Sequence, residues 1–207
     1  MRFKLKGTEV TISFTFLALV LLTITVKNLN SLSLVLAFAP LHEAVHLLFI
    51  CILSSPPKFF KLTLFGACIV RGEGVGRSCF REIIINASAP LFNLLAGLLF
   101  YCLGQLNWGR GEVYNNLYEI NLVLGLFNLI PYYNFDGGNA LFYLLSAFIS
   151  QERVNKIITI LSVIVAILFS SLSAYVFFQY KRNYALVIMS IYMLLSLVFK
   201  KQNTLDY

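Results

Sequence analysis

Long apolar stretches separated by short polar segments dominate this chain, and they predict transmembrane helices. A helix needs about 20 mainly apolar residues to cross a hydrocarbon core roughly 30 Å thick. Stretches of about that kind cover residues 10–26, 32–53, 83–103, 117–131, 157–178 and 184–199. We therefore expect an all-α polytopic membrane protein with six transmembrane helices.

The fourth stretch is short and interrupted. Pro131 ends it, Asp136, Gly137 and Gly138 follow, and a short apolar helix is expected over residues 140–148. Non-helical backbone at membrane depth is tolerated only where protein or a water-filled cavity surrounds it. The interruption therefore predicts a functional cavity.

The longest connection, residues 54–82, joins the second and third stretches. Apolar, aromatic and threonine residues over 58–66 follow Pro56-Pro57, and three glycines follow later. This pattern predicts a β-strand or hairpin at the cytoplasmic interface. A plain loop is the alternative.

The composition excludes an ordinary soluble domain. Hydrophobic residues make up 59% of the chain and charged residues 12%, against about 25% charged residues in a typical soluble domain. The net charge of +7 would suit nucleic acid, but the positions of the basic residues indicate membrane topology instead.

Six helices with a cytosolic N-terminus divide the sixteen lysines and arginines unequally. The cytoplasmic segments would hold Arg2, Lys4, Lys6, Lys58, Lys61, Arg71, Arg77, Arg81, Arg153, Lys156, Lys200 and Lys201. The opposite face would hold Lys27, Arg110, Lys181 and Arg182. This bias follows the positive-inside rule, so we expect a cell-membrane protein with both termini in the cytoplasm and no nucleic-acid partner.

The two histidines of the chain, His42 and His46, lie four residues apart in the second stretch, with Glu43 between them. On a helix this HExxH spacing places both imidazoles on one face, as two ligands of one zinc ion require, and Glu43 is the candidate general base. Ionisable groups within a membrane are costly, which favours a functional role. The alternative is that the histidines hydrogen-bond neighbouring helices, with Glu43 paired to one of them.

A catalytic zinc site needs three protein ligands and an open position. The aspartates are Asp136, at the interruption, and Asp206, in the C-terminal tail. Asp136 is expected at a depth compatible with the histidines, whereas Glu119 falls near the outer end of its stretch. The cysteines lack the paired spacing of a thiolate site. Asp136 is therefore the expected third ligand.

Three motifs together resemble the site-2 protease family of intramembrane zinc metalloproteases, including its compact bacterial members of the stage IV sporulation FB type. The motifs are HEAVH at 42–46, the Asn-x-x-Pro…Asp-Gly pattern at 128–138, and Ala-Pro-Leu-Phe-Asn at 89–93, which is similar to the family's Gly-Pro-x-x-Asn. The departures are Ala89 for glycine, Asn134 for a second proline and Phe135 for leucine.

The resemblance implies a single intramembrane protease domain over residues 1–207, without a PDZ-like or regulatory domain. It implies one Zn²⁺ per chain held by His42, His46 and Asp136, with Glu43 activating the zinc-bound water that attacks a peptide bond. The expected partners are the bilayer, a membrane-embedded or membrane-surface protein substrate and a regulatory membrane protein. The family's substrate-pairing strand would correspond here to residues within 58–70, namely Lys61, Leu62, Thr63, Leu64, Phe65 and Gly66.

Some interpretations remain open in the sequence. One role for Asn128 is to stabilise an oxyanion or to position the substrate. The alternative is a hydrogen bond between helices, which is also open to Asn86, Asn93 and Asn121. A zinc transporter would need ionisable residues spread through several helices, and four of the six stretches have almost none. A pseudoprotease would be expected to have lost part of the motif, which is intact.

Overall fold

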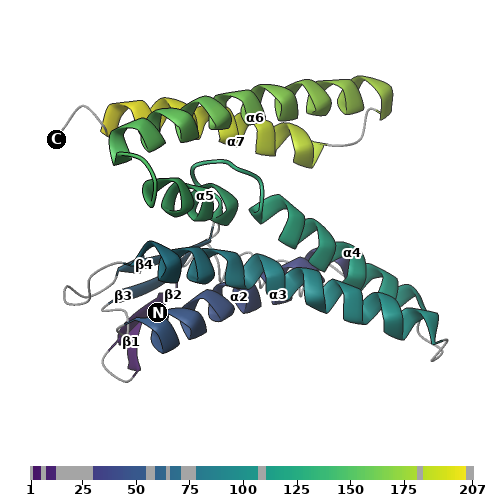
Figure 1. Cartoon of the computed structure of the whole chain (residues 1–207). Coiled ribbons are helices and arrows are strands. Elements are labelled where there is room, and N and C mark those ends of the chain that lie inside the picture. Colours follow the sequence, from purple (N-terminus) through teal and green to yellow (C-terminus); the bar gives the residue numbers. More distant parts are fainter. Residues whose placement is uncertain are drawn as a thin grey trace. The chain divides into compact units, whose positions relative to one another are not determined.

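The computed structural model of the protein describes residues 2–5, 8–12, 30–54, 59–63, 66–70, 78–106, 111–180 and 184–203. The chain divides into two compact units, Met1–Leu129 and Ile130–Tyr207. Figure 1 labels the elements of both units, and each unit is described by itself.

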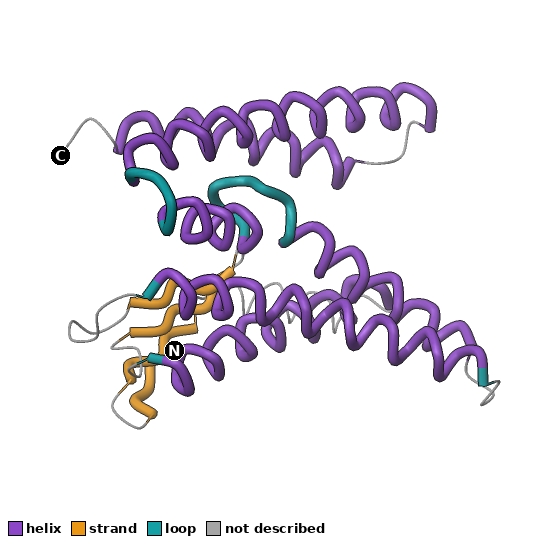
Figure 2. The backbone as a smooth tube through the Cα atoms, in the orientation of Figure 1, coloured by secondary structure: helices purple, strands orange, loops and turns teal. Residues whose placement is uncertain are grey.

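A four-stranded sheet belongs to the first unit (Figure 2). Its strands are β1 (Arg2–Leu5), β2 (Thr8–Ile12), β3 (Phe59–Thr63) and β4 (Gly66–Val70), in the spatial order β1-β2-β3-β4. The β1–β2 and β3–β4 pairs are antiparallel, and β2 pairs parallel to β3. The β3–β4 pair lies in the connection where the sequence favoured a strand or hairpin. Among the described strands, β1 and β4 are at the two edges of the sheet.

The start of the first expected transmembrane helix was placed wrongly at residue 10. Val10 to Ile12 belong to strand β2 and pair with both β1 and β3. This strand is rich in β-branched residues, which favour strands: Thr8, Val10, Thr11 and Ile12. The local preference for a strand therefore extends into the apolar stretch. The remainder of that expected helix, residues 13–26, lies outside the described residues.

The described residues of the first unit also form the helices α2 (Asn30–Leu53), α3 (Cys79–Gln105) and α4 (Gly111–Asn128). Gly125 allows α3 and α4 to pack closely. A Cβ atom at this position would lie 3.0 Å from the carbonyl oxygen of Pro90. Small residues at such contacts let helix backbones approach each other in membrane proteins.

The second unit consists of α5 (Asp136–Ser146), α6 (Gln151–Tyr180) and α7 (Tyr184–Asn203). The long helices α6 and α7 run side by side (Figure 1), and Val154, Ile158, Ala166 and Met193 are buried there. Helix α5 begins at Asp136, four residues before the expected start. The prediction that Asp136, Gly137 and Gly138 form the interruption was therefore wrong, because they make the first turn of α5 and the non-helical segment is residues 129–135.

Among the described residues, two helices are long and apolar enough to cross a membrane, Cys79–Gln105 and Gln151–Gln179. Shorter apolar helical segments are Phe38–Leu53 and Leu186–Val198. Both long helices expose large apolar side chains, including Leu95 and Leu98 on α3 and Ile167 and Leu168 on α6. Such surfaces suit a lipid environment, so the protein is a mainly helical protein whose helices are consistent with membrane insertion.

Candidate metal centre

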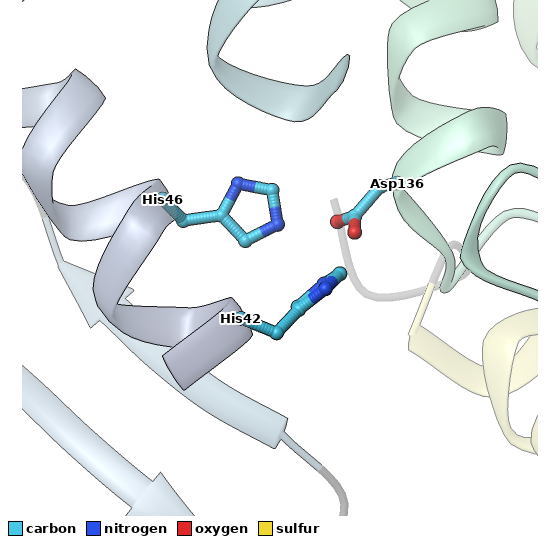
Figure 3. A group of neighbouring side chains, drawn as sticks. All are labelled: His42, His46 and Asp136. Atoms are coloured by element: carbon cyan, nitrogen blue, oxygen red, sulfur yellow. The ribbon is translucent and has the colours of Figure 1, made fainter. Parts of the chain in front are cut away.

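His42 and His46 lie on consecutive turns of α2, and both imidazoles are buried. Their ring centroids are 5.0 Å apart and their planes are inclined by 84°. Figure 3 shows the two rings projecting from the same face of the helix. The HExxH spacing therefore places the two imidazoles next to each other on one face of α2.

A backbone carbonyl orients His46. The Nδ1 atom of His46 lies 2.8 Å from the carbonyl oxygen of Ile85 on α3. A carbonyl oxygen can only accept a hydrogen bond, so Nδ1 carries the proton. In the neutral ring the lone pair is then on Nε2, which is the form that a metal ion binds.

An asparagine side chain orients His42. The Nδ1 atom of His42 lies 2.6 Å from Oδ1 of Asn93, and Asn93 is fully buried on α3. This amide oxygen accepts the Nδ1 proton, so His42 also carries its lone pair on Nε2. Histidine ligands usually donate their second ring nitrogen to an oxygen acceptor, and zinc favours imidazole nitrogen. The two side chains therefore fit a zinc site.

The other candidate residues of the first unit occupy different positions. Glu43 follows His42 directly on α2 and is half-buried. Asn128 is the last residue of α4, and its Nδ2 atom donates to the carbonyl oxygen of Leu124, 3.0 Å away, within its own helix. Among the candidate substrate-strand residues, Lys61, Leu62 and Thr63 are in β3 and Gly66 is in β4, while Leu64 and Phe65 lie outside the described residues.

Asp136 is the first residue of α5 in the second unit (Figure 3). An acidic side chain in the first turn of a helix interacts favourably with the helix dipole. The preceding loop is closed by a hydrogen bond from the backbone N–H of Phe135 to the carbonyl oxygen of Tyr132, 2.9 Å away. This bond fixes the chain immediately before Asp136.

Two tyrosines attach this loop to α6 and α7. The hydroxyl of Tyr132 donates to the carbonyl oxygen of Met193, and it also lies 2.6 Å from the hydroxyl of Ser196. The backbone N–H of Tyr133 donates to Oγ of Ser162 across 3.0 Å, and the Tyr133 hydroxyl donates to the Ser196 carbonyl. Both long helices of the second unit therefore position the segment that leads into Asp136.

Gly138 is required by close backbone packing. A Cβ atom at this position would lie 2.0 Å from the carbonyl oxygen and 2.5 Å from the carbonyl carbon of Tyr132. Only glycine therefore lets the first turn of α5 contact the loop in this way. The second glycine of the Asp-Gly-Gly sequence thus has a structural role that does not depend on metal binding.

Sequence reasoning missed three orienting groups at these positions. Asn93 was considered as part of the Ala-Pro-Leu-Phe-Asn motif and as a contact between helices, but it was not linked to His42, although a buried amide in an apolar stretch is a signal for a hydrogen-bonded partner. The carbonyl of Ile85 has no sequence signal, because every residue has a carbonyl. The role of Tyr132 depends on its contact with Met193, 61 residues away.

This chain was compared with known protein families and with solved structures, and both comparisons found similar proteins. Residues 105–171 match peptidase family M50. The fold is similar to that of a site-2 protease from Methanocaldococcus jannaschii, with a TM-score of 0.65, 22% sequence identity, and coverage of 93% of this chain and 91% of that chain. No significant match was found among curated proteins. Part of the chain is therefore similar to peptidase family M50, and its fold is similar to that of a site-2 protease.

Proposed function

We propose that this protein is an intramembrane zinc metalloprotease in which His42, His46 and Asp136 hold one Zn²⁺ per chain. The observation that carries the proposal is the orientation of the two buried histidines, each with its Nδ1 proton donated to an oxygen acceptor. Two imidazoles and a carboxylate match the three-ligand composition of catalytic zinc sites.

Zinc in such a site supplies Lewis-acid chemistry that acidifies water and polarises a peptide carbonyl. Glu43 then acts as the general base. Its carboxylate takes a proton from the attacking water, and the same proton is returned to the nitrogen of the leaving peptide. Glu43 follows the ligand His42 directly in the chain, so its backbone is placed by the same helix. Asn128 is a further candidate for stabilising the developing oxyanion.

The substrate class follows from the membrane setting. We propose six transmembrane spans, both termini in the cytoplasm and a single catalytic domain, with a membrane protein as substrate and a regulatory membrane protein as a further partner. A peptide bond within a helix must be exposed locally before hydrolysis. An extended substrate would pair with β4, an edge strand of the described part of the sheet, because strand addition satisfies the backbone of the incoming segment.

The proposal is tested by removing and restoring the metal. Full-length protein purified in detergent or lipid nanodiscs is treated with a chelator and then titrated with Zn²⁺. We expect one Zn²⁺ per chain by elemental analysis. The substrate is a membrane protein that proteomics finds accumulated in membranes containing the Glu43→Gln protein. We expect the rate at which it is cleaved to rise and fall with the zinc occupancy.

Each contrary result would point to a different class of protein. Stoichiometric zinc with no hydrolysis of any membrane protein that accumulates in the Glu43→Gln strain would favour a pseudoprotease. Zinc uptake into sealed vesicles that requires the intact histidines would favour a transporter. Absence of zinc binding by correctly folded protein would overturn the metalloprotease proposal itself.

A further inference from the structure

A chain of hydrogen bonds crosses three helices and ends on the imidazole of His42. The Nδ1 atom of His42 on α2 lies 2.6 Å from Oδ1 of Asn93 on α3. The Nδ2 atom of Asn93 donates across 2.9 Å to Oδ1 of Asn121 on α4. The Nδ2 atom of Asn121 donates across 2.8 Å to the carbonyl oxygen of Leu117.

The last member of this chain determines the direction of every bond in it. The carbonyl of Leu117 can only accept, so the NH₂ group of Asn121 faces it and the Asn121 oxygen faces Asn93. That oxygen accepts from the NH₂ group of Asn93, which turns the Asn93 oxygen toward His42. The Nδ1 atom of His42 must therefore be the donor, and the neutral ring has its lone pair on Nε2.

Burial makes this arrangement difficult to replace. Asn93 and Asn121 are both fully buried, and His42 is nearly so. No bulk water is available to compensate a reversed amide, and a buried polar group without a partner is costly. Gly125 allows the close contact of α3 and α4, the two helices that carry these amides.

We propose that Asn93 and Asn121 are positioning residues for the metal centre, which act by fixing the tautomer and ring orientation of His42. This inference rests on the proposed zinc function. His46 differs, because its Nδ1 proton goes to the backbone carbonyl of Ile85, which no side-chain substitution removes. The two histidines are therefore oriented by different means, and only His42 depends on the asparagines.

The first test compares zinc affinity in full-length protein, measured by competition with a chromophoric chelator. Asn93→Leu removes the acceptor of the Nδ1 proton, and we expect zinc to bind about 10–100-fold more weakly, as is typical for loss of such a partner. Asn93→Asp keeps an oxygen acceptor toward His42, and we expect it to retain most of the wild-type affinity. A merely structural role would not produce this rescue.

A matched control lies on the same helix. Asn86 is also an asparagine of α3, but its Nδ2 atom donates to the carbonyl oxygen of Glu82 within that helix. Asn86→Leu should leave zinc affinity unchanged. Asn121→Leu and Asn121→Asp repeat the comparison one link further from the imidazole, and they supply the test if Asn93→Leu does not fold.

A second readout reports the tautomer directly. The chain has two histidines, so ¹⁵N-histidine labelling gives resonances from two imidazoles only. At about pH 8, where an ordinary imidazole is neutral, we expect the proton on Nδ1 of both rings. Asn93→Leu should change the His42 resonances and leave those of His46 in place.

The possible results separate the two proposals. Wild-type protein that does not bind zinc would overturn the proposed function. Zinc binding by wild-type protein with equal affinity in folded Asn93→Leu, or equal weakening in Asn93→Asp and Asn93→Leu, would overturn the positioning role alone. A wild-type His42 that carries its proton on Nε2 would overturn it as well.

Discussion

The hydroxyl of Tyr132 donates a hydrogen bond to the backbone carbonyl of Met193, 2.6 Å away. Tyr132 belongs to the loop before Asp136, and Met193 lies near the middle of α7. Both residues are fully buried. A single phenol thus joins the segment that leads into a candidate ligand to a helix far along the chain.

Removal of this hydroxyl should weaken the second unit. Tyr132→Phe removes the hydroxyl that contacts both the Met193 carbonyl and the Ser196 hydroxyl. We expect the free energy of unfolding to fall by about 1–2 kcal/mol. We also expect this variant to cleave its substrate more slowly, because the loop before Asp136 is less well fixed. Thermal unfolding and substrate cleavage measure the two effects. Tyr175→Phe, at an exposed position on α6, should change neither quantity, and equal effects of the two variants would contradict the proposed anchoring.

A methyl group at Gly138 should displace the start of α5. Gly138→Ala places a Cβ atom against the Tyr132 carbonyl, so the backbone must shift, and we expect a destabilisation of about 1–3 kcal/mol. Gly111→Ala is the matched control, because it also lies in the first turn of a helix and its Cβ would meet no atom within 4 Å. Comparable melting temperatures for the two variants would show that the close contact is not required.

The general base should be separable from metal binding. Glu43→Gln keeps the size of the side chain but cannot accept the proton of the attacking water. We expect a loss of activity of at least about 100-fold, with zinc content equal to that of wild-type protein. Elemental analysis and a cleavage assay on the same preparation measure both properties. Cleavage by this variant at the wild-type rate would exclude Glu43 as the base.

The ligands should behave differently from the base. His46→Ala and Asp136→Ala each remove one proposed donor atom, so both should lose stoichiometric zinc as well as activity. Their helix content, measured by circular dichroism, should remain close to that of wild-type protein. A folded variant that retains one zinc per chain would reject that residue as a ligand.

Asn128 offers a test between two roles. Its amide donates to the Leu124 carbonyl in its own helix, which favours a local role, whereas an oxyanion role predicts a kinetic effect. If Asn128 stabilises the transition state, Asn128→Ala should lower kcat by about 100-fold or more with little change in zinc content. A change smaller than about threefold in kcat would assign Asn128 to the end of α4 alone.

The sequence by itself was enough to predict a zinc site and to name its candidate residues. Two histidines and a glutamate at helical spacing in an apolar stretch predict a zinc-binding helix, because the period of the helix follows from its backbone geometry alone. Helices α2, α3, α6 and α7 were also predictable, since long apolar runs have few alternatives. Local β preference obscured the start of the first stretch, where Val10 to Ile12 form a strand.

Only the tertiary structure decided how the histidines are held. The acceptors of their Nδ1 protons are Asn93, 51 residues from His42, and the carbonyl of Ile85, 39 residues from His46. The attachment of Tyr132 to Met193 and the close contact at Gly138 are likewise products of packing. Such relationships join positions with no periodic or local signal, because a hydrogen bond depends on distance in space and a carbonyl acceptor is common to every residue.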